Sequence, residues 1–248
     1  MKKRLFTVIS VLFWLLVWQI AAMVFDQKIL LASPLAVAER LAELVPQFSF
    51  VKSIGFTLGR ILLGFITGVA TGTALAALSG KVSFVRQLLS PLVSAVKSIP
   101  VASFTILALI WISSENLSVL ISFLIAVPIV YSNMLEGIDS LDPKLNEMAQ
   151  IFEIPAGKRF VGIYLSQLLP YFRSASRLAM GLCWKSGVAA EVIGIPDGSI
   201  GEMLYMSKVY LETEDLFAWT FVIIVLSYLC EKLFGMLVDA AVRRVERM

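Results

Sequence analysis

The chain has 248 residues, of which 58% are hydrophobic and 16% charged, and its formal net charge is +3. A soluble domain carries about a quarter charged residues, so this composition excludes an ordinary soluble protein and indicates an integral membrane protein without a nucleic-acid surface. Histidine is absent, and the two cysteines, Cys183 and Cys230, stand far apart in apolar runs. We therefore predict no catalytic residue, metal site or disulfide framework, and an intramembrane enzyme is disfavoured.

The first predicted element is the uncharged run Leu5–Phe25, which follows the basic start MKKR. A signal peptide has an apolar core of about 7–15 residues followed by a small-residue cleavage site. This run is longer, and it ends in Val24, Phe25 and Asp26. We expect a retained transmembrane helix, with a cleaved signal peptide as the alternative.

The next predicted element is an amphipathic helix over Ser33–Val45 (SPLAVAERLAELV). Ser33 is suited to cap its start, Pro34 suits the first helical position, and apolar residues recur at helical spacing. We expect this helix to lie at the outer membrane surface.

Six segments of the chain have the roughly 20 apolar residues that a transmembrane helix needs. They are Leu5–Phe25, Ile54–Leu78, Pro91–Ile112, Leu117–Leu135, Ser174–Ile195 and Leu216–Val238. Only Ser113–Asn116 separates the third from the fourth, which predicts a tight helical hairpin. In the second, Gly64, Gly68 and Gly72 form a small-residue stripe that favours close helix packing. Packing within the chain is the favoured interpretation, and a subunit contact is the alternative.

The distribution of Lys and Arg predicts the orientation of these spans. A cytoplasmic N-terminus places thirteen of them at or near the inner face and leaves four outside. The inner set is Lys2, Lys3, Arg4, Lys81, Arg86, Lys144, Lys158, Arg159, Arg173, Arg177, Arg243, Arg244 and Arg247, and the outer set is Lys28, Arg40, Lys52 and Lys208. Both termini are therefore predicted to be cytoplasmic.

The segment between the fourth and fifth spans begins with a short amphipathic helix. Asp142 is suited to cap it, with Pro143 in the first turn. An apolar stripe at helical spacing follows, made by Leu145, Met148, Ala149 and Phe152. Pro155 ends this helix, and Gly157 permits a sharp change of direction.

A second amphipathic segment starts at Lys158 and is expected to end near Pro170, with Phe160, Tyr164 and Leu168 available for one face. The predicted fold is thus an all-α polytopic membrane protein with about six transmembrane helices and a cytoplasmic helix–turn–helix. Its exposed turn suggests a docking element for a partner protein. The alternative is that the two helices only lie on the inner membrane surface.

This helix–turn–helix resembles the EAA loop of ABC importer permeases. That pattern opens with Glu-Ala-Ala, has a glycine six residues after the Glu, and closes with an apolar residue and Leu-Pro. Here Glu147-Met148-Ala149 stands at the opening, Ile163 at the later apolar position, and Leu169-Pro170 at the close. The chain departs from the pattern at the glycine position, which holds Glu153, with a glycine later at Gly157.

The resemblance covers most of the chain from about Ser53 onward and points to the nitrate/sulfonate/taurine branch. It is carried by SAVKSIPVASFTILALIWI (94–112), GLCWKSGVAAEVIG (181–194), GSIGEMLY (198–205) and DLFAWTFVIIVLSYLCEKLF (215–234). We divide the chain into residues 1–52, the first span with the outer amphipathic segment, and residues 53–248, the permease domain. The coupling loop spans residues 137–173.

The resemblance implies that two permease subunits form the solute pathway, that two ATPase subunits dock on the coupling loops, and that an extracytoplasmic binding protein delivers the solute. The chain has no G-x-x-x-x-G-K-[ST] phosphate loop, so ATP is expected on the partner and no cofactor on this chain. A homodimer is the simpler assembly. The docking surface implied by position consists of Glu147, Ala149, Glu153, Ile154, Pro155 and Gly157.

Charged residues inside spans usually face a cavity or a partner. Arg60 and Lys97 stand near predicted span ends, where their long side chains favour snorkelling to the interface. Lys185 and Glu191 are six residues apart and do not share one helical face, so an intrahelical ion pair is disfavoured. Together with Trp184, these two residues are the candidates for the solute pathway, although pairing with a neighbouring helix is favoured over solute contact.

The resemblance implies a multi-pass protein of the bacterial inner membrane that carries a small anion of the nitrate, sulfonate or taurine type. An ATP-independent secondary transporter or channel is the main alternative, and a structural scaffold is another. The sequence leaves the solute open, because the binding protein supplies most of the selectivity in these systems.

Overall fold

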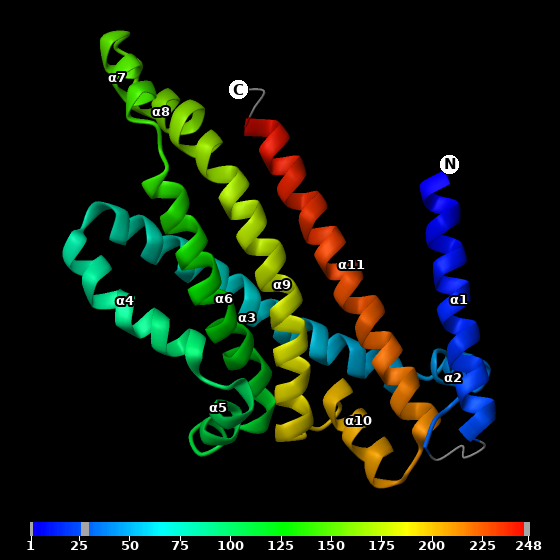
Figure 1. Cartoon of the computed structure of the whole chain (residues 1–248). Coiled ribbons are helices and arrows are strands. Elements are labelled where there is room, and N and C mark those ends of the chain that lie inside the picture. Colours follow the sequence, from blue (N-terminus) through cyan, green and yellow to red (C-terminus); the bar gives the residue numbers. More distant parts are fainter. Residues whose placement is uncertain (1, 26–29, 246–248) are drawn as a thin grey trace.

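The computed structural model describes residues 2–25 and 30–245, which form helices and turns, with no strand in these two ranges (Figure 1). The helices are α1 (Lys2–Phe25), α2 (Pro34–Leu44), α3 (Phe48–Lys81), α4 (Ser83–Ser98), α5 (Val101–Ala108), α6 (Ser114–Asp139), α7 (Pro143–Ile151), α8 (Ala156–Arg159), the π-helical η1 (Phe160–Leu165), α9 (Ser166–Gly194), α10 (Ile200–Val209) and α11 (Thr213–Val245). The predicted all-α class is confirmed.

The centre of the molecule is a seam between α3 and α6. A methyl group added at Gly64 would lie 2.3 Å from the carbonyl oxygen of Val119, and one at Gly68 would lie 2.6 Å from Cβ of Ala126. These glycines therefore let the two backbones approach each other within one chain. The favoured interpretation of the glycine stripe, packing within the chain, is confirmed.

The spans agree in part with the predicted six. Four helices of the described chain, α1, α3, α6 and α11, are long and apolar enough to cross a membrane, and α4 with α5 makes a fifth candidate if the bent pair counts as one span. Helix α9 is not among them because it carries Arg173, Arg177, Lys185 and Glu191. It nevertheless packs against α3, α5, α6, α10 and α11. The count of six includes α9 and stays a prediction.

The third predicted span, Pro91–Ile112, is wrong as a continuous helix. The chain breaks between Ser98 and Val101, and α4 and α5 meet at an angle of 100°. Pro100 has no backbone N–H and disfavours helical geometry at the residue before it, and Ile99 is indeed extended, with φ −74° and ψ 126°,. The predicted hairpin lies slightly earlier than expected, because α6 already begins at Ser114.

Helix α2 forms as predicted, and it is held against α11. The Ser33 side chain accepts a hydrogen bond from the backbone N–H of Ala36 at 3.2 Å and caps the helix. Further along, the Arg40 guanidinium donates to both carboxylate oxygens of Asp215. These hydrogen bonds raise the pKa of Arg40 further above its ordinary value. The guanidinium of Arg40 therefore stays charged beside Asp215.

The two ends of the molecule differ in what they carry (Figure 1). Helices α7 and α8 project beyond the other helices at one end, and α1 begins and α11 ends toward that same side. Helices α5 and α10 lie at the opposite end. We refer to these as the bracket end and the α10 end, where the bracket is the segment from Asp142 to Leu165.

Candidate docking bracket and solute pathway

The first arm of the bracket is α7. The Asp142 side chain accepts a hydrogen bond from the backbone N–H of Lys144 at 2.9 Å, so the predicted cap forms, with Pro143 at the first helical position. Of the predicted apolar stripe, only Ala149 is fully buried, at 1% exposure, whereas Met148 and Phe152 are exposed. The arm therefore presents apolar surface outward.

The turn of the bracket lies at Glu153, not at Gly157 as the sequence suggested. Glu153 has φ +49°, the left-handed region, and the next N–H, that of Ile154, donates to the carbonyl of Ala149 at 2.9 Å. Gly157 lies inside α8 with an ordinary helical backbone. The left-handed residue thus stands six residues after Glu147, where the resembling pattern has its glycine.

The second arm does not end near Pro170, contrary to the prediction. Helix α8, η1 and α9 follow one another without an intervening turn from Ala156 to Gly194, and Pro170 is inside α9. The π-helical turns of η1 loosen the hydrogen-bond ladder just before the proline. The Ser166 hydroxyl donates to the carbonyl of Gly162 at 2.7 Å, which satisfies one of the loosened acceptors. The bracket is therefore joined directly to α9.

The residues predicted for docking divide into two groups. Glu147, Glu153, Pro155 and Gly157 are exposed and Ile154 is half-buried, all at the tip or along one side of the bracket. Ala149 is buried inside the bracket. A methyl group added at Gly157 would meet no atom within 4 Å, so the surface around it is open.

The far end of α9 is fastened to α3 and α10 through Glu191. Its carboxylate Oε2 accepts from the Thr57 hydroxyl at 2.7 Å and from the backbone N–H of Gly201 at 3.4 Å. The backbone N–H of Ile200 in turn donates to Oγ1 of Thr57 at 3.0 Å. A buried carboxylate at a helix N-terminus is favoured by the orphan N–H groups and the helix dipole. Glu191 thereby links three helices at the α10 end.

The three residues predicted for the solute pathway are not brought together on one surface. Trp184 and Glu191 are fully buried, Trp184 in the main core with Ile61 and Phe65. Lys185 is exposed on another face of α9 and forms no ion pair with any described residue. The structure therefore gives Glu191 and Trp184 interior contacts and leaves only Lys185 at the surface.

The other two charged residues flagged by the sequence also find partners. Arg60 donates to the carbonyl of Glu115 and to the side chain of Asn116, and its guanidinium lies 4.1 Å from the ring centre of Phe56. Lys97 donates to the Ser132 hydroxyl at 2.7 Å. Arg60 thus holds α3 to the start of α6, and its position near a membrane interface stays a prediction.

Sequence reasoning did not single out Thr57 and Gly201, which complete the site around Glu191. A methyl group added at Gly201 would lie 2.3 Å from Cβ of Glu191, so the glycine permits α10 to start against α9. The signal available in the sequence was the pair of glycines in GSIG (198–201), which follows the end of α9 at Gly194. That signal does not identify the partner helix, which only the fold supplies.

Comparison with known proteins identifies the architecture. Residues 61–247 match the protein family described as "Binding-protein-dependent transport system inner membrane component". The chain belongs to this family. Proteins of this family are the permease subunits of ABC importers, in which a separate ATPase subunit hydrolyses ATP. Family membership decides against the ATP-independent transporter and the scaffold.

Several relatives of this permease have assigned names. It is 27% identical over 218 residues to the putative aliphatic sulfonates transport permease protein SsuC of Bacillus subtilis, a match that covers 88% of this chain and 76% of that protein. It is 24% identical to the taurine transport system permease protein TauC of Escherichia coli (86% and 80% covered) and 24% identical to the nitrate import permease protein NrtB of Synechococcus elongatus (60% and 53% covered).

The fold of the permease also has solved counterparts. A chain of the MetNI methionine ABC transporter, solved in inward-facing conformations, superposes with a TM-score of 0.61 at 16% identity, and the match covers 80% of this chain and 97% of that one. At this identity the likeness concerns the fold alone.

Proposed function

We propose that this permease couples an ATPase to a solute pathway through the bracket and α9. The observation that carries the proposal is the helical continuity from Ala156 to Gly194. At 1.5 Å per residue such a helix is roughly 55–60 Å long, enough to cross a membrane and extend beyond it. A displacement of the bracket would reach Glu191, and through it α3 and α10, along a helical path that no turn interrupts.

The docking surface proposed for the ATPase is the exposed tip of the bracket. Glu147 and Glu153 offer carboxylates for charge-assisted hydrogen bonds, and Ile154 with Pro155 offers apolar contact between them. Ala149 contributes by its small size, because it lets α7 lie close to the rest of the bracket. Exposed Ile151 and Phe152 extend the apolar part of this surface.

We place the bracket and both termini on the cytoplasmic side and α10 on the outer side. The thirteen-to-four distribution of Lys and Arg supports this orientation, and so does the position of α1 and α11, whose terminal ends lie toward the bracket end (Figure 1). The proposed assembly is a homodimer of this chain with two ATPase subunits and an extracytoplasmic solute-binding protein.

The solute proposed is a small oxyanion, a sulfonate in the first place and nitrate as the alternative. The names of the relatives support this choice. One relative is named for aliphatic sulfonates and another for taurine, which is an aminosulfonate. No residue of the bracket bears on this choice, because the bracket faces the ATPase.

Co-purification tests the docking proposal. The tagged permease is co-expressed with its ATPase and purified in detergent, as wild type and as the double variant Glu147→Arg, Gly157→Trp. Both positions are exposed, and Gly157 has open space around it, so the variant is expected to fold. We expect it to lose at least about 90% of the bound ATPase, because charge reversal and a bulky side chain oppose docking.

The matched control is Lys208→Glu, which reverses one exposed charge at the α10 end. This variant should retain the ATPase at the wild-type ratio. Retention by the double variant as well, with all three proteins monodisperse, would show that the ATPase docks elsewhere.

A further inference from the structure

Helix α4 has two unlike faces. Phe84, Leu88 and Leu92 form an exposed apolar stripe, in which successive members stand four positions apart. A polar stripe is displaced from it by two positions along the chain and consists of Arg86, Ser90, Ser94 and Lys97. Two positions along a helix correspond to about 200°, so the two stripes point in nearly opposite directions. The apolar face of α4 suits lipid, and its polar face requires water or polar partners.

The polar stripe of α4 faces a polar stripe on α6. Arg86 donates to both carboxylate oxygens of Asp139, at 2.9 and 2.6 Å, and Lys97 donates to Ser132. Between these contacts lies a groove of about 380 Å³, which is also lined by Ser90, Ser94 and Glu136. Asp139 is the last residue of α6 before the bracket. The groove therefore opens at the bracket end and runs inward to Lys97.

Charge is distributed unevenly along this groove. At the mouth, Arg86 and Asp139 neutralise each other, and Glu136 stands one helical turn from Ser132. At the inner end, the Lys97 ammonium has a neutral hydroxyl for a partner and forms no ion pair with any described carboxylate. An ammonium keeps three donors, so two remain for an incoming acceptor. The inner end is thus suited to an anion.

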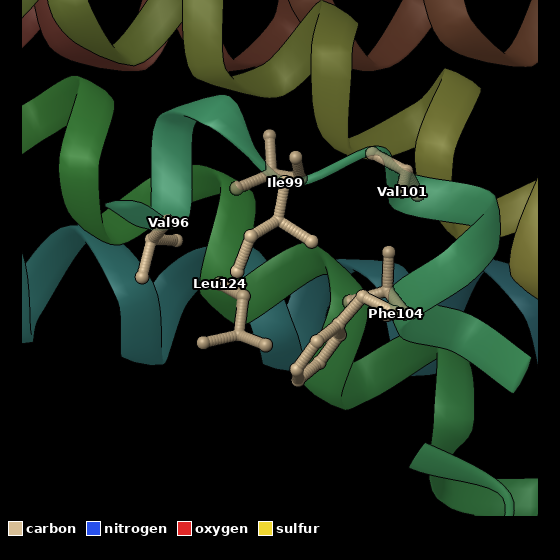
Figure 2. A pocket seen from close by; sticks show the side chains of 7 residues that line it. Val96, Ile99, Val101, Phe104 and Leu124 are labelled. Carbon is tan, nitrogen blue, oxygen red and sulfur yellow. The ribbon is translucent and has the colours of Figure 1, made fainter. Parts of the chain in front are cut away.

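Beyond Lys97 the groove gives way to apolar side chains at the break between α4 and α5. Figure 2 shows Val96, Ile99, Phe104 and Leu124 gathered around a small cavity of about 60 Å³. No charged residue lines this cavity. Apolar constrictions of this kind exclude hydrated ions. Val96 of this cavity and Lys97 of the groove stand at successive positions of α4, so the two features adjoin along that helix.

We propose that the groove between α4 and α6 lines the bracket-side half of the solute pathway within each subunit of the dimer, that Lys97 binds a small oxyanion such as a sulfonate at its inner end, and that the apolar cluster at Ile99 closes it. The inference rests on the proposed function for the existence of a pathway and for the solute class. The location of the site rests on the groove itself. Lys97 is proposed here in addition to the predicted Trp184, Lys185 and Glu191, of which Lys185 alone is exposed.

Cysteine labelling tests this inference without knowledge of the solute. Ser94→Cys is introduced into the permease co-expressed with its ATPase, and inside-out membrane vesicles expose the bracket end. Two water-soluble methanethiosulfonates of similar size are used, one carrying an ethylsulfonate and one an ethyltrimethylammonium group. We expect Ser94→Cys to react with both, and to react faster with the sulfonate reagent.

The charge of Lys97 is then changed. In Lys97→Gln the sulfonate-to-ammonium rate ratio at Ser94→Cys should fall about tenfold, because a unit charge roughly 5–6 Å away is lost in a partly hydrated groove. Lys97→Arg should keep the ratio. Lys81→Gln removes the same charge from an exposed position outside the groove and should leave the ratio unchanged. A parallel sample without Ser94→Cys measures the labelling of the native Cys183 and Cys230, which is subtracted.

Leu92→Cys on the apolar stripe sets the level for a lipid-facing position. Labelling of Ser94→Cys no faster than Leu92→Cys would overturn the water-filled pathway. A ratio that is the same in Lys97→Gln and wild type would overturn the role of Lys97. The ATPase is also co-purified from the same vesicles. Because it docks at the bracket end, away from Lys97, its retention shows that the proposed function holds even where the labelling results overturn the pathway or the role of Lys97.

Discussion

Three residues other than glycine have a left-handed backbone in the described chain: Glu153 at φ +49°, Ile195 at +46° and Leu211 at +59°. Each directly follows or lies close behind the end of a helix, where the chain must change direction,. Glycine adopts this conformation without strain, whereas other residues pay about 1–2 kcal/mol. The packing around these turns therefore fixes conformations that their side chains disfavour.

Substitution of Glu153 measures this strain in the bracket. Glu153→Gly should stabilise the permease by about 1 kcal/mol, which corresponds to a rise of about 2–4 °C in the unfolding midpoint in detergent. Glu153→Val should lower the midpoint, because a β-branched side chain is least tolerant of positive φ. Equal midpoints for the Gly and Val variants would mean that the turn does not lie at Glu153.

At the scale of elements, the bundle depends on how closely α3 approaches α6. The backbone of α6 occupies the space where side chains of Gly64, Gly68 and Gly72 would stand. On the same helix, Gly55 and Gly59 have no atom within 4 Å of an added methyl group. One helix thus holds both buried glycines that packing requires and exposed ones that it does not.

This contrast gives a matched pair of variants. Gly68→Ala should destabilise the permease by about 1–3 kcal/mol through overpacking against Ala126. Gly59→Ala should be neutral or stabilising by up to about 1 kcal/mol, because alanine is the better helix former and meets no obstacle. Denaturation of both variants in mixed micelles gives the comparison. An equal effect of the two substitutions would contradict the α3–α6 seam.

At the scale of the whole molecule, α1 and α2 are held to the rest mainly through α11. The rings of Trp18 in α1 and Phe217 in α11 lie 5.5 Å apart, and Phe50, at the start of α3 just after α2, lies 5.0 Å from Trp219 of α11. Beside these aromatic contacts stands the ion pair of Arg40 with Asp215, whose side chains are 32% and 13% exposed. Much of the rest of α1 is exposed and apolar, as suits a helix surrounded by lipid,.

A double-mutant cycle tests the contribution of this ion pair. Arg40→Gln should cost about 1–2 kcal/mol, because it leaves the largely buried Asp215 without its charged partner. Asp215→Asn combined with Arg40→Gln should cost no more than the single change, since no uncompensated charge remains. Additive costs would show that the two residues are not coupled, and Lys52→Gln serves as the exposed control.

The pH dependence of the pair follows from the raised pKa of Arg40. A base whose pKa is raised on folding contributes its full stabilisation below the unfolded-state pKa and loses it only as the pH rises past the folded-state value. For arginine both lie above the working range,. We therefore expect the difference between wild type and Arg40→Gln to be the same at pH 7 and pH 10.

Local chemistry was enough to predict much of the permease from its sequence. The caps at Ser33 and Asp142, the helix Pro34–Leu44 and the glycine seam depend on neighbouring residues or on a simple period, and all are present. The Glu147 resemblance and the apolar spans led to the family. The start of the bracket was predicted for the same reason, since the capping Asp142 acts on its neighbours, whereas the turn was expected at Gly157 and lies at Glu153.

The tertiary structure decided what depends on partners distant in the chain. Pro170 lies inside α9, whereas Pro100 stands at the break between α4 and α5, and the prolines alone do not tell the two cases apart. The sequence placed Lys97 and Glu191 in apolar spans, and there a charge is costly whichever way it points. Only the packing of α3, α4, α6 and α10 shows that Glu191 is buried and accepts through Oε2 from Thr57 and Gly201, while Lys97 faces an open groove.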